Sequence, residues 1–284
     1  MEQLIKGKPI ATKIKEKTAL EVEKLKKAGI HPKLAVVLVG DDKPSQIYVR
    51  KKKQAAEKAG IEFVMLEIEE KISQDELISK IIEIQKDDNI CGLIVQLPLP
   101  EHLYTPAVLN AIDPKIDVDC LTDINLGKLV MKTNFMVPPT PGAVMTILKE
   151  LGVDLPGKNA TILGMGALVG KPLAIMLMNE RCSVTVCNSA TRDTAEKCLN
   201  ADIIVSGVGK KDLVRGNMVS PRTIVIDTGI CFENNQMYGD VNVEEIAQAG
   251  AFVTPTPSGV GPITVARLLW NTILCAKKIH NLKN

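Results

Sequence analysis

The chain has 284 residues, of which 45% are hydrophobic and 24% are charged, and its formal net charge is +2. This composition is typical of a soluble globular protein with a sizeable core and room for two domains. The small net charge and the 3% of aromatic residues argue against a nucleic-acid-binding protein, because such proteins need basic surfaces and aromatic side chains on which bases stack.

The cysteines and histidines do not form a recognisable ligand group. Seven cysteines are scattered along the chain with no Cys-x-x-Cys pair, and the three histidines are far apart. This pattern predicts reduced thiols, and neither a disulfide framework nor a metal site is expected. The sequence shows no signal peptide and no run of 18 apolar residues, so we expect a cytoplasmic protein without a membrane partner.

Apolar periodicity in the first half predicts alternating helices and strands. The expected elements are a helix over 11–28, a strand over 34–39, a helix over 44–59, a strand over 61–67, a helix over 73–86 that begins with a capping box, and a strand over 91–100. This β-α-β-α-β order predicts a parallel sheet, and such sheets bind ligands at the carboxyl ends of their strands.

The helix over 44–59 carries an unusual lysine. At helical spacing, Tyr48, Lys52, Ala55 and Ala59 share one stripe, which should be buried or face a ligand. Lys52 could simply extend past the small alanines into solvent. Alternatively, it is a partly buried amine with a phenol one turn away. Desolvation would then lower the pKa of the amine and suit the pair to acid/base chemistry near neutral pH.

Three further polar residues stand near the carboxyl end of the strand over 91–100 or shortly after it. Gln96 is either a capping amide or part of a site at that edge. Asp117 and Asp119 are two residues apart, so in an extended chain they would point to the same side. The two carboxylates could bind a metal, grip a guanidine-like ring edge or remain solvated, and the lack of neighbouring His or Glu ligands argues against a metal.

A stiff segment at 138–141 predicts a hinge, and a glycine-rich stretch over 160–172 follows it. Strand-like residues lead into Gly164 and Gly166, and a helix is expected after Gly170. A helix N-terminus behind a glycine turn suits a phosphate. The spacing G-x-G-x-x-x-G is one residue longer than the usual dinucleotide fingerprint. The alternatives are a dinucleotide site and an ordinary tight turn, and the flanking strand and helix favour the first.

Strands are expected over 183–189, 201–209 and 223–230, each ending where a cofactor could lie, although the glycines there could merely tighten the loops. An NAD-specific site usually has an acidic residue at the end of the first of these strands. Asn188, Ser189, Thr191 and Arg192 stand there instead, which favours NADP. A constrained loop within 251–265 precedes a final helix from Ile263 to about His280, which could return to the first domain.

Several motifs occur in an order that identifies a family. They are Tyr-Val-Arg-Lys-Lys (48–52), Val-Gln-Leu-Pro-Leu-Pro (95–100), Asp-Val-Asp (117–119), Thr-Pro-Gly (140–142), G-x-G-x-x-x-G-x-Pro (164–172) and Pro-Ser-Gly-Val-Gly-Pro-Ile-Thr-Val (257–265). Over essentially its whole length the sequence resembles the bifunctional methylenetetrahydrofolate dehydrogenase/cyclohydrolase family.

The resemblance implies an α/β protein with two domains and a cleft between them. An N-terminal three-layer catalytic domain would cover 1–120, with the C-terminal helix at about 263–284 packed back on it, and a Rossmann-type NAD(P)-binding domain would cover 121–262. It also implies a cytoplasmic homodimer that oxidises methylenetetrahydrofolate with NADP+, NAD being possible. The same enzyme would then hydrolyse the product to 10-formyltetrahydrofolate, which supports purine biosynthesis.

The family's roles carry over to individual residues of this chain. Tyr48 would stack on the folate, Lys52 would move protons at the bridging carbon, Gln96 would hold Lys52, and Asp119 would bind the amino edge of the pterin. The remaining expected contacts are Val95, Leu97, Pro257, Ser258, Gly259, Val260 and Gly261 for the folate, and Gly164, Met165, Gly166, Ser189 and Ile230 for the cofactor.

The chain departs from the family pattern at four positions. Gly166 stands where a serine is usual, and Met165 where a small residue or an arginine is common, so both bear on the choice between NADP and NAD. Cys120 and Ser258 replace glycines beside the expected folate site and bear on folate affinity.

Two other functions remain as alternatives to the bifunctional enzyme. The first is a different oxidoreductase, either a monofunctional methylenetetrahydrofolate dehydrogenase or another Rossmann enzyme. The second is a nucleotide-sensing module without turnover.

Overall fold

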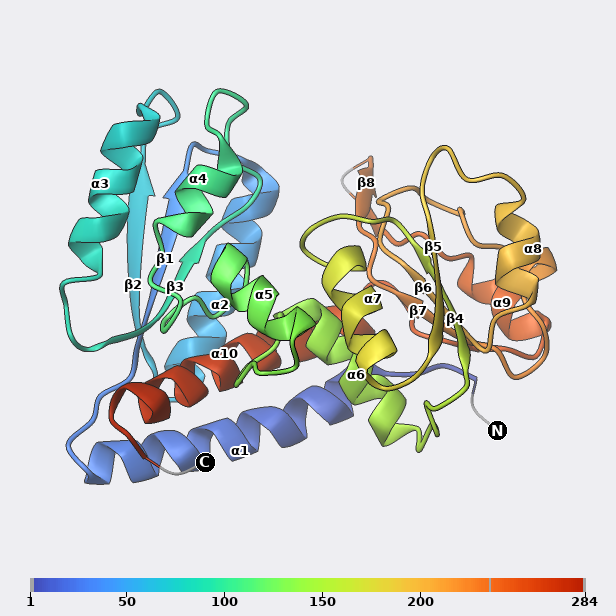
Figure 1. Cartoon of the computed structure of the whole chain (residues 1–284), viewed down its shortest axis with the longest axis horizontal. Coiled ribbons are helices and arrows are strands. Elements are labelled where there is room, and N and C mark those ends of the chain that lie inside the picture. The colour runs from blue at the N-terminus through green and yellow to red at the C-terminus, as the bar shows by residue number, and fades with distance from the viewer. Residues whose placement is uncertain (1–2, 235, 283–284) are drawn as a thin grey trace. The chain divides into compact units, whose positions relative to one another are not determined.

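The computed structural model describes residues 3–234 and 236–282, which form two compact α/β units (Figure 1). The three-stranded unit holds Lys13–Pro139 and the chain from Val265 onward. The five-stranded unit holds the described residues up to Thr12 together with Thr140–Thr264. Helices α1 (Gly7–Lys27) and α10 (Val260–Ile279) each begin in the five-stranded unit and continue into the three-stranded unit.

The three-stranded unit is built on a parallel sheet with strand order β2-β1-β3. Its strands and connecting helices are β1 (Lys33–Val39), α2 (Lys43–Lys58), β2 (Glu62–Ile68), α3 (Gln74–Ile84) and β3 (Ile90–Val95). The predicted β-α-β-α-β order and parallel sheet are confirmed. The capping box at Ser73 and Glu76 is also present, so the helix begins where its side chains can satisfy free amides.

Both faces of this sheet are covered, which explains why β1 is apolar from Leu34 to Val39. Leu34, Val36 and Leu38 point to a core shared with α1, α2 and α10. Ala35, Val37 and Val39 point to a second core shared with α3 and with α4 (Thr105–Asn110). The unit therefore has three layers, as the resemblance implied.

The C-terminal helix is held to α1 by polar contacts as well as by the core. The ammonium group of Lys17 lies 4.2 Å from the ring centre of Trp270. Lys277 and Glu21 form an ion pair at 2.5 Å, and both side chains are largely buried.

The final helix begins at Val260, before the predicted Ile263. Pro262 lies in its first turn, where a proline removes no helical hydrogen bond.

The five-stranded unit has a parallel sheet with strand order β10-β7-β6-β4-β5. Its elements are α6 (Pro139–Glu150), β4 (Asn159–Leu163), α7 (Gly170–Asn179), β5 (Ser183–Cys187), α8 (Thr194–Leu199), β6 (Ile203–Ser206), the 3-10 turn η1 (Gly216–Met218), β7 (Ile224–Asp227), α9 (Val243–Gln248) and β10 (Phe252–Val253). The chain leaves β4 first toward β5 and then returns to β6 on its other side. The strand order therefore reverses at β4, which is where such sheets bind ligands.

Several elements differ from the sequence prediction. The helices α4 and α5 (Asp123–Val130) and the antiparallel pair β8 (Cys231–Glu233) and β9 (Gln236–Tyr238) were not predicted, because each is too short to show a clear apolar period. The strands predicted over 201–209 and 223–230 end earlier, at Ser206 and Asp227. Gly207 and Thr228 still donate their amides to Leu163 and Ser206 on neighbouring strands. The later residues Val208, Gly209 and Gly229 donate theirs to buried carboxylates instead.

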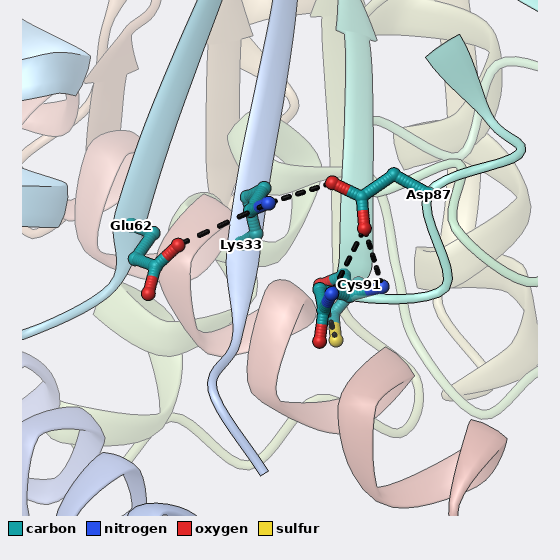
Figure 2. Close-up of polar contacts among 5 residues, drawn as sticks. Lys33, Glu62, Asp87 and Cys91 are labelled. Carbon is teal, nitrogen blue, oxygen red and sulfur yellow. Dashed lines mark hydrogen bonds and ion pairs between the residues drawn. The ribbon is translucent and has the colours of Figure 1, made fainter. Parts of the chain in front are cut away.

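A charged cluster joins the amino ends of the strands in the three-stranded unit (Figure 2). The Lys33 ammonium lies 2.6 Å from a carboxylate oxygen of Asp87 and 3.9 Å from one of Glu62. Asp87 also accepts hydrogen bonds from the backbone and side-chain amides of Asn89, both at 3.0 Å. The hydrogen bond from Lys33 lowers the pKa of Asp87 to about 2, and Asp87 in turn raises the pKa of Lys33.

We predict that Asp87→Asn lowers the free energy of unfolding by about 1 kcal/mol at pH 7, a value discounted for the solvent exposure of the carboxylate. Because the pKa of Asp87 is depressed in the folded state, its contribution is present above the unfolded pKa of about 3.9 and is lost as the pH falls toward 2. Chemical denaturation from pH 7 to pH 2 measures both effects.

The matched control is Asp88→Asn. Asp88 is exposed and makes no hydrogen bond or ion pair with the described residues. If the two variants lose the same stability at pH 7, the ion pair does not contribute as the structure indicates.

Candidate functional site

Helix α2 carries Tyr48 and Lys52 along the margin of its buried face. The helix begins at a cap in which the Asp42 carboxylate accepts the Ser45 amide at 2.8 Å. Val49 and Ala56 are buried in the core, and this fixes the rotation of the helix. Tyr48 and Lys52 are consequently half-buried, whereas the other basic residues of the helix are exposed.

Gln96 connects Lys52 to the carboxyl end of β3. The Lys52 ammonium donates to Gln96 Oε1 at 3.0 Å. Gln96 Nε2 donates to the carbonyl of Leu97 at 2.7 Å, and the Gln96 backbone amide donates to the carbonyl of Val37 at 2.8 Å. Both ends of the side-chain amide are therefore committed, and the oxygen is the end that faces the lysine.

The surroundings of Lys52 favour its neutral form. Burial lowers the pKa of the amine, and the negative charge of Asp119 partly opposes that shift. Burial likewise raises the pKa of Asp119, and the charge of Lys52 opposes it. The structure thus brings together an amine and a carboxylic acid that both exchange protons closer to neutrality than they would in water.

The expectation that Asp117 and Asp119 point to the same side is wrong, because the chain turns between them. The Cys120 amide donates to the carbonyl of Asp117 at 3.0 Å. The Asp117 side chain is buried and accepts the amides of Leu121 and Thr122 at 3.2 and 2.9 Å. Asp117 therefore has a structural role in closing the turn, and Asp119 is left half-buried beside Lys52.

Sequence reasoning missed Asn271, a fully buried residue of α10 that holds the backbone next to Asp119. Its side-chain amide nitrogen donates to the carbonyls of Val118 and Val137, both at 2.8 Å. A Cβ on residue 92 would lie 2.8 Å from Val118 Cγ1. The strand β3 can therefore lie this close to the segment around Val118 only because residue 92 is a glycine. The one signal in the sequence was that Asn271 is a polar residue in an apolar helical stretch. That signal does not show which groups the side chain binds.

The hydroxyl of Tyr48 is buried and has no hydrogen-bond partner among the residues that the structure describes. Burial also raises the pKa of this phenol, so it remains protonated at neutral pH. A buried hydroxyl without a partner is uncommon. It is therefore available to a ligand placed against α2.

The expected folate loop, Pro257–Gly261, belongs to the five-stranded unit. It packs on the start of α1: the Gly7 amide donates to the carbonyl of Ser258 at 2.9 Å. Ser258 has a φ of 87°, a backbone conformation that favours glycine. At Gly259 the position of a Cβ would lie 2.5 Å from the Pro255 carbonyl oxygen, so a side chain there would collide with the loop.

The glycine turn after β4 is shaped by backbone contacts. Gly164 has a φ of 99°, and any side chain at Gly170 would collide with the Gly164 carbonyl. By contrast, no atom lies within 4 Å of the position of a Cβ on Gly166. The residue before α7, Val169, provides no side-chain cap. Among the first three residues of this ten-residue helix, Pro172 has no N–H and the Lys171 amide donates to the Gly166 carbonyl at 3.1 Å, so the Gly170 amide is the one left to meet an anion.

The other expected cofactor residues lie at the same end of the sheet. Asn188 follows β5, and its side-chain amide donates to the sulfur of Met165 at 3.2 Å, joining the loops after β4 and β5. Ser189 is exposed, and Met165 and Ile230 expose 44% and 40% of their surfaces. A helix N-terminus without a side-chain cap, beside exposed apolar side chains, fits a dinucleotide, which has a charged diphosphate between flat rings.

The described residues were also compared with the requirements of a metal site, a membrane span and a surface groove. Among residues 3–234 and 236–282 no three His, Cys, Asp or Glu side chains are grouped to hold a metal. Over the same part of the chain, no helix is both long and apolar enough to cross a membrane. A surface groove of about 780 Å³ between β2 and α3 is lined largely by charged side chains, and none of the expected site residues lines it.

Comparison with known proteins agrees with this arrangement. Residues 5–119 match the model of the tetrahydrofolate dehydrogenase/cyclohydrolase catalytic domain, and residues 138–280 match that of the family's NAD(P)-binding domain. The bifunctional protein FolD of Acetivibrio thermocellus is 44% identical over 282 residues, covering 99% of both chains. That of Campylobacter concisus is 45% identical over 276 residues, covering 97% of this chain and 98% of the relative.

Solved structures give the same result. The FolD methylenetetrahydrofolate dehydrogenase/cyclohydrolase of Campylobacter jejuni has a TM-score of 0.93 and 40% identity, covering 97% of this chain and 98% of the other. The Trypanosoma brucei enzyme, solved with NADP cofactor and an inhibitor, has a TM-score of 0.92 and 36% identity, covering 97% of both chains.

Fold and site together define a two-part α/β enzyme, in which one part carries the Lys52 cluster and the other has a nucleotide-binding Rossmann sheet. The sequence matches fix the family within that class. The chain belongs to the tetrahydrofolate dehydrogenase/cyclohydrolase family.

Two glycine variants test whether the turn after β4 is shaped as described. Gly170→Ala forces the Gly164 carbonyl to move, so we expect a destabilised fold, by about 1–3 kcal/mol, and weaker NADP+ binding. Gly166→Ala adds its methyl group in open space, so we expect the unliganded protein to melt within about 1 °C of the parent. Thermal unfolding and NADP+ titration measure both. Equal melting temperatures for the two variants would contradict this geometry.

Proposed function

We propose that the protein oxidises 5,10-methylenetetrahydrofolate with NADP+ and hydrolyses the resulting 5,10-methenyltetrahydrofolate to 10-formyltetrahydrofolate. The observation that carries the proposal is the contact between Lys52 and Gln96 beside Asp119, in the unit that matches the family's catalytic domain. The glycine turn after β4 lies in a stretch that matches the NAD(P)-binding domain.

The first step removes a hydride from the carbon that bridges two nitrogens, and NADP+ is the oxidant that accepts it. The carbon is left as part of an amidinium-like cation, because both nitrogens share the positive charge. The protein's task in this step is to hold the folate in position, and we assign it to Tyr48, Gln96 and Asp119. Tyr48 would lie against the folate ring, and Asp119 would accept hydrogen bonds from the pterin amino edge.

The second step adds water to that cation. One oxygen–hydrogen bond of the water breaks as its oxygen bonds to the carbon. The bond from the carbon to N5 then breaks as the remaining oxygen–hydrogen bond gives up its proton, a carbonyl forms and N5 takes up a proton, leaving the formyl group on N10. We assign the released proton to Lys52, because burial lowers the pKa of its amine below the ordinary value and so favours proton exchange. Gln96 would keep the amine pointing at the reacting carbon.

We propose further contacts with the folate and with the cofactor. Val95 and Leu97 flank Gln96 in the chain and would line the ring site. The loop Pro257–Gly261 would reach the substrate with backbone groups. Gly164, Met165, Gly166, Ser189 and Ile230 would contact the cofactor. Directly after β5 stand Asn188 and Ser189, where an NAD site usually has a carboxylate, and the same loop carries Arg192, which supports NADP over NAD.

We further propose that the enzyme acts as a homodimer in the cytoplasm and that its product serves purine biosynthesis. These proposals rest on the family resemblance. Sedimentation at micromolar concentration tests the dimer, and a monomer under those conditions would exclude it.

Progress curves with NADP+ and with NAD+, followed through both products, test the proposed activity. We expect NADPH to form with methylenetetrahydrofolate and 10-formyltetrahydrofolate to follow. If neither nucleotide is reduced, the proposal fails. If methenyltetrahydrofolate persists with no formyl product, the enzyme is a monofunctional dehydrogenase.

In Lys52→Met we expect methenyltetrahydrofolate hydrolysis to fall by about 10²–10⁴-fold, the usual contribution of a positioned acid/base. The control is Lys53→Met, because Lys53 is the next residue and lies on the exposed side of α2. Hydrolysis at the parent rate in Lys52→Met, or an equal loss in Lys53→Met, would remove Lys52 from the mechanism.

A further inference from the structure

Asp240 is a fully buried carboxylate at the carboxyl ends of β6 and β7. Its Oδ2 accepts the Ser206 hydroxyl at 2.6 Å and the Val208 amide at 2.7 Å. Its Oδ1 accepts the amides of Gly209 and Lys210, both at 2.8 Å. Three consecutive amides of the loop after β6 therefore point at one carboxylate from a segment 30 residues further along the chain.

A second buried carboxylate, Asp227, holds the segment that carries Asp240. Asp227 ends β7 and is the register partner of Ser206 on β6. It accepts the amides of Gly229, Asp240 and Val241 at 3.0, 3.1 and 3.2 Å. The two acidic residues thus connect the loop after β6, the loop after β7 and the segment around Asp240.

The loops that these carboxylates hold present two apolar side chains. Val208 exposes 50% of its surface and Ile230 exposes 40%. A side chain at Gly229 would occupy the position of the Asp240 carboxylate, and a Cβ at Gly209 would lie 3.2 Å from the Ile230 carbonyl oxygen. The two loops are therefore packed against each other with the carboxylate beneath them.

The same surface continues into the glycine turn. At Gly164 the position of a Cβ would lie 2.8 Å from the Gly207 carbonyl oxygen and 3.4 Å from Val208 Cγ2. Val208 and Ile230 thus come from two neighbouring strands, and Val208 lies next to the turn after β4. A wall of this kind suits one flat ring of a dinucleotide.

We propose that Asp240 is a positioning residue for the cofactor, which holds Val208 and Ile230 in place as the apolar wall of the NADP site. The inference rests on the proposed function. Because Asp240 already binds the amides of Val208, Gly209 and Lys210, those amides are not available to the cofactor diphosphate. The residue acts through the two loops and does not touch the reacting atoms.

The chemistry of the pair explains why a carboxylate is needed at position 240. All the groups that face it are N–H or O–H donors, and an asparagine would turn its own NH2 toward two of them. Burial and the charge of Asp240 raise the pKa of Asp227 to about 6. Two buried acidic residues so close together repel each other when both are charged. Asp227 and Asp240 are held in place by charge-assisted hydrogen bonds from the loops that they organise.

The test is Asp240→Asn in the full-length protein, with two separate measurements. Calorimetric titration gives the dissociation constant for NADP+, and hydrolysis of methenyltetrahydrofolate without nucleotide reports on the chemistry assigned to Lys52. We expect NADP+ to bind about 10- to 100-fold more weakly, as follows from losing buried charge-assisted hydrogen bonds. The hydrolysis rate should stay within about twofold, because Lys52, Gln96 and Asp119 all lie in the three-stranded unit.

The matched control is Asp202→Asn. Asp202 accepts the Asn159 amide at 2.9 Å and stands before β6, at the opposite end of the same sheet. The Asp202→Asn substitution should alter the stability of the protein without altering its affinity for NADP+. Unchanged NADP+ affinity in Asp240→Asn, or the same loss in Asp202→Asn, would overturn the inference.

A second variant decides the case in which Asp240→Asn does not fold. Ser206→Ala removes one donor and leaves both carboxylates in place. It should weaken NADP+ binding several-fold with hydrolysis unchanged, and unchanged NADP+ affinity would again overturn the inference. A parent protein that binds no NADP+ would instead refute the proposed function, so the two failures are distinguishable.

Discussion

The partly buried hydrogen bond between Lys52 and Gln96 is the constraint on which the proposed chemistry depends. An ammonium group on the margin of a helix would normally remain solvated and charged. Here α2 is fixed by its buried face, β3 ends one residue before Gln96, and the Gln96 amide is held by the Leu97 carbonyl. The lysine therefore meets a neutral oxygen and a partly buried carboxylate, and burial lowers its pKa.

Much of this arrangement follows from local patterns. Apolar periodicity predicted the parallel sheet of the three-stranded unit, since strands buried on both faces are apolar throughout. The stripe through Tyr48 and Lys52 was visible because helical spacing alone brings them to one side. The two departures from the family's glycines, Cys120 and Ser258, fall on backbone with φ of 56° and 87°. The usual glycine there suits a left-handed conformation, which this chain adopts with other residues.

The rest depends on contacts between distant segments, which a single sequence does not reveal. Asp117 and Asp119 looked equivalent, and only the turn that ends at Cys120 makes one structural and leaves the other beside Lys52. Asn271 lies 153 residues from the carbonyl of Val118 that it binds. Asp240 resembles any loop aspartate until β6 and β7 are placed next to each other. The loop amides that Asp240 and Asp227 bind also explain why the predicted strands over 201–209 and 223–230 were too long.

Direct titration of Lys52 tests the central claim. In protein labelled with ¹³C at the lysine ε carbon, the Lys52 resonance can be assigned by its loss in Lys52→Met and followed with pH. The account predicts a midpoint below the ordinary value of 10.5, and a still lower midpoint in Asp119→Asn, because the opposing carboxylate charge is gone. A midpoint at or above 10.5 in the parent protein would show that Lys52 is solvated, and the account of its role would then be wrong.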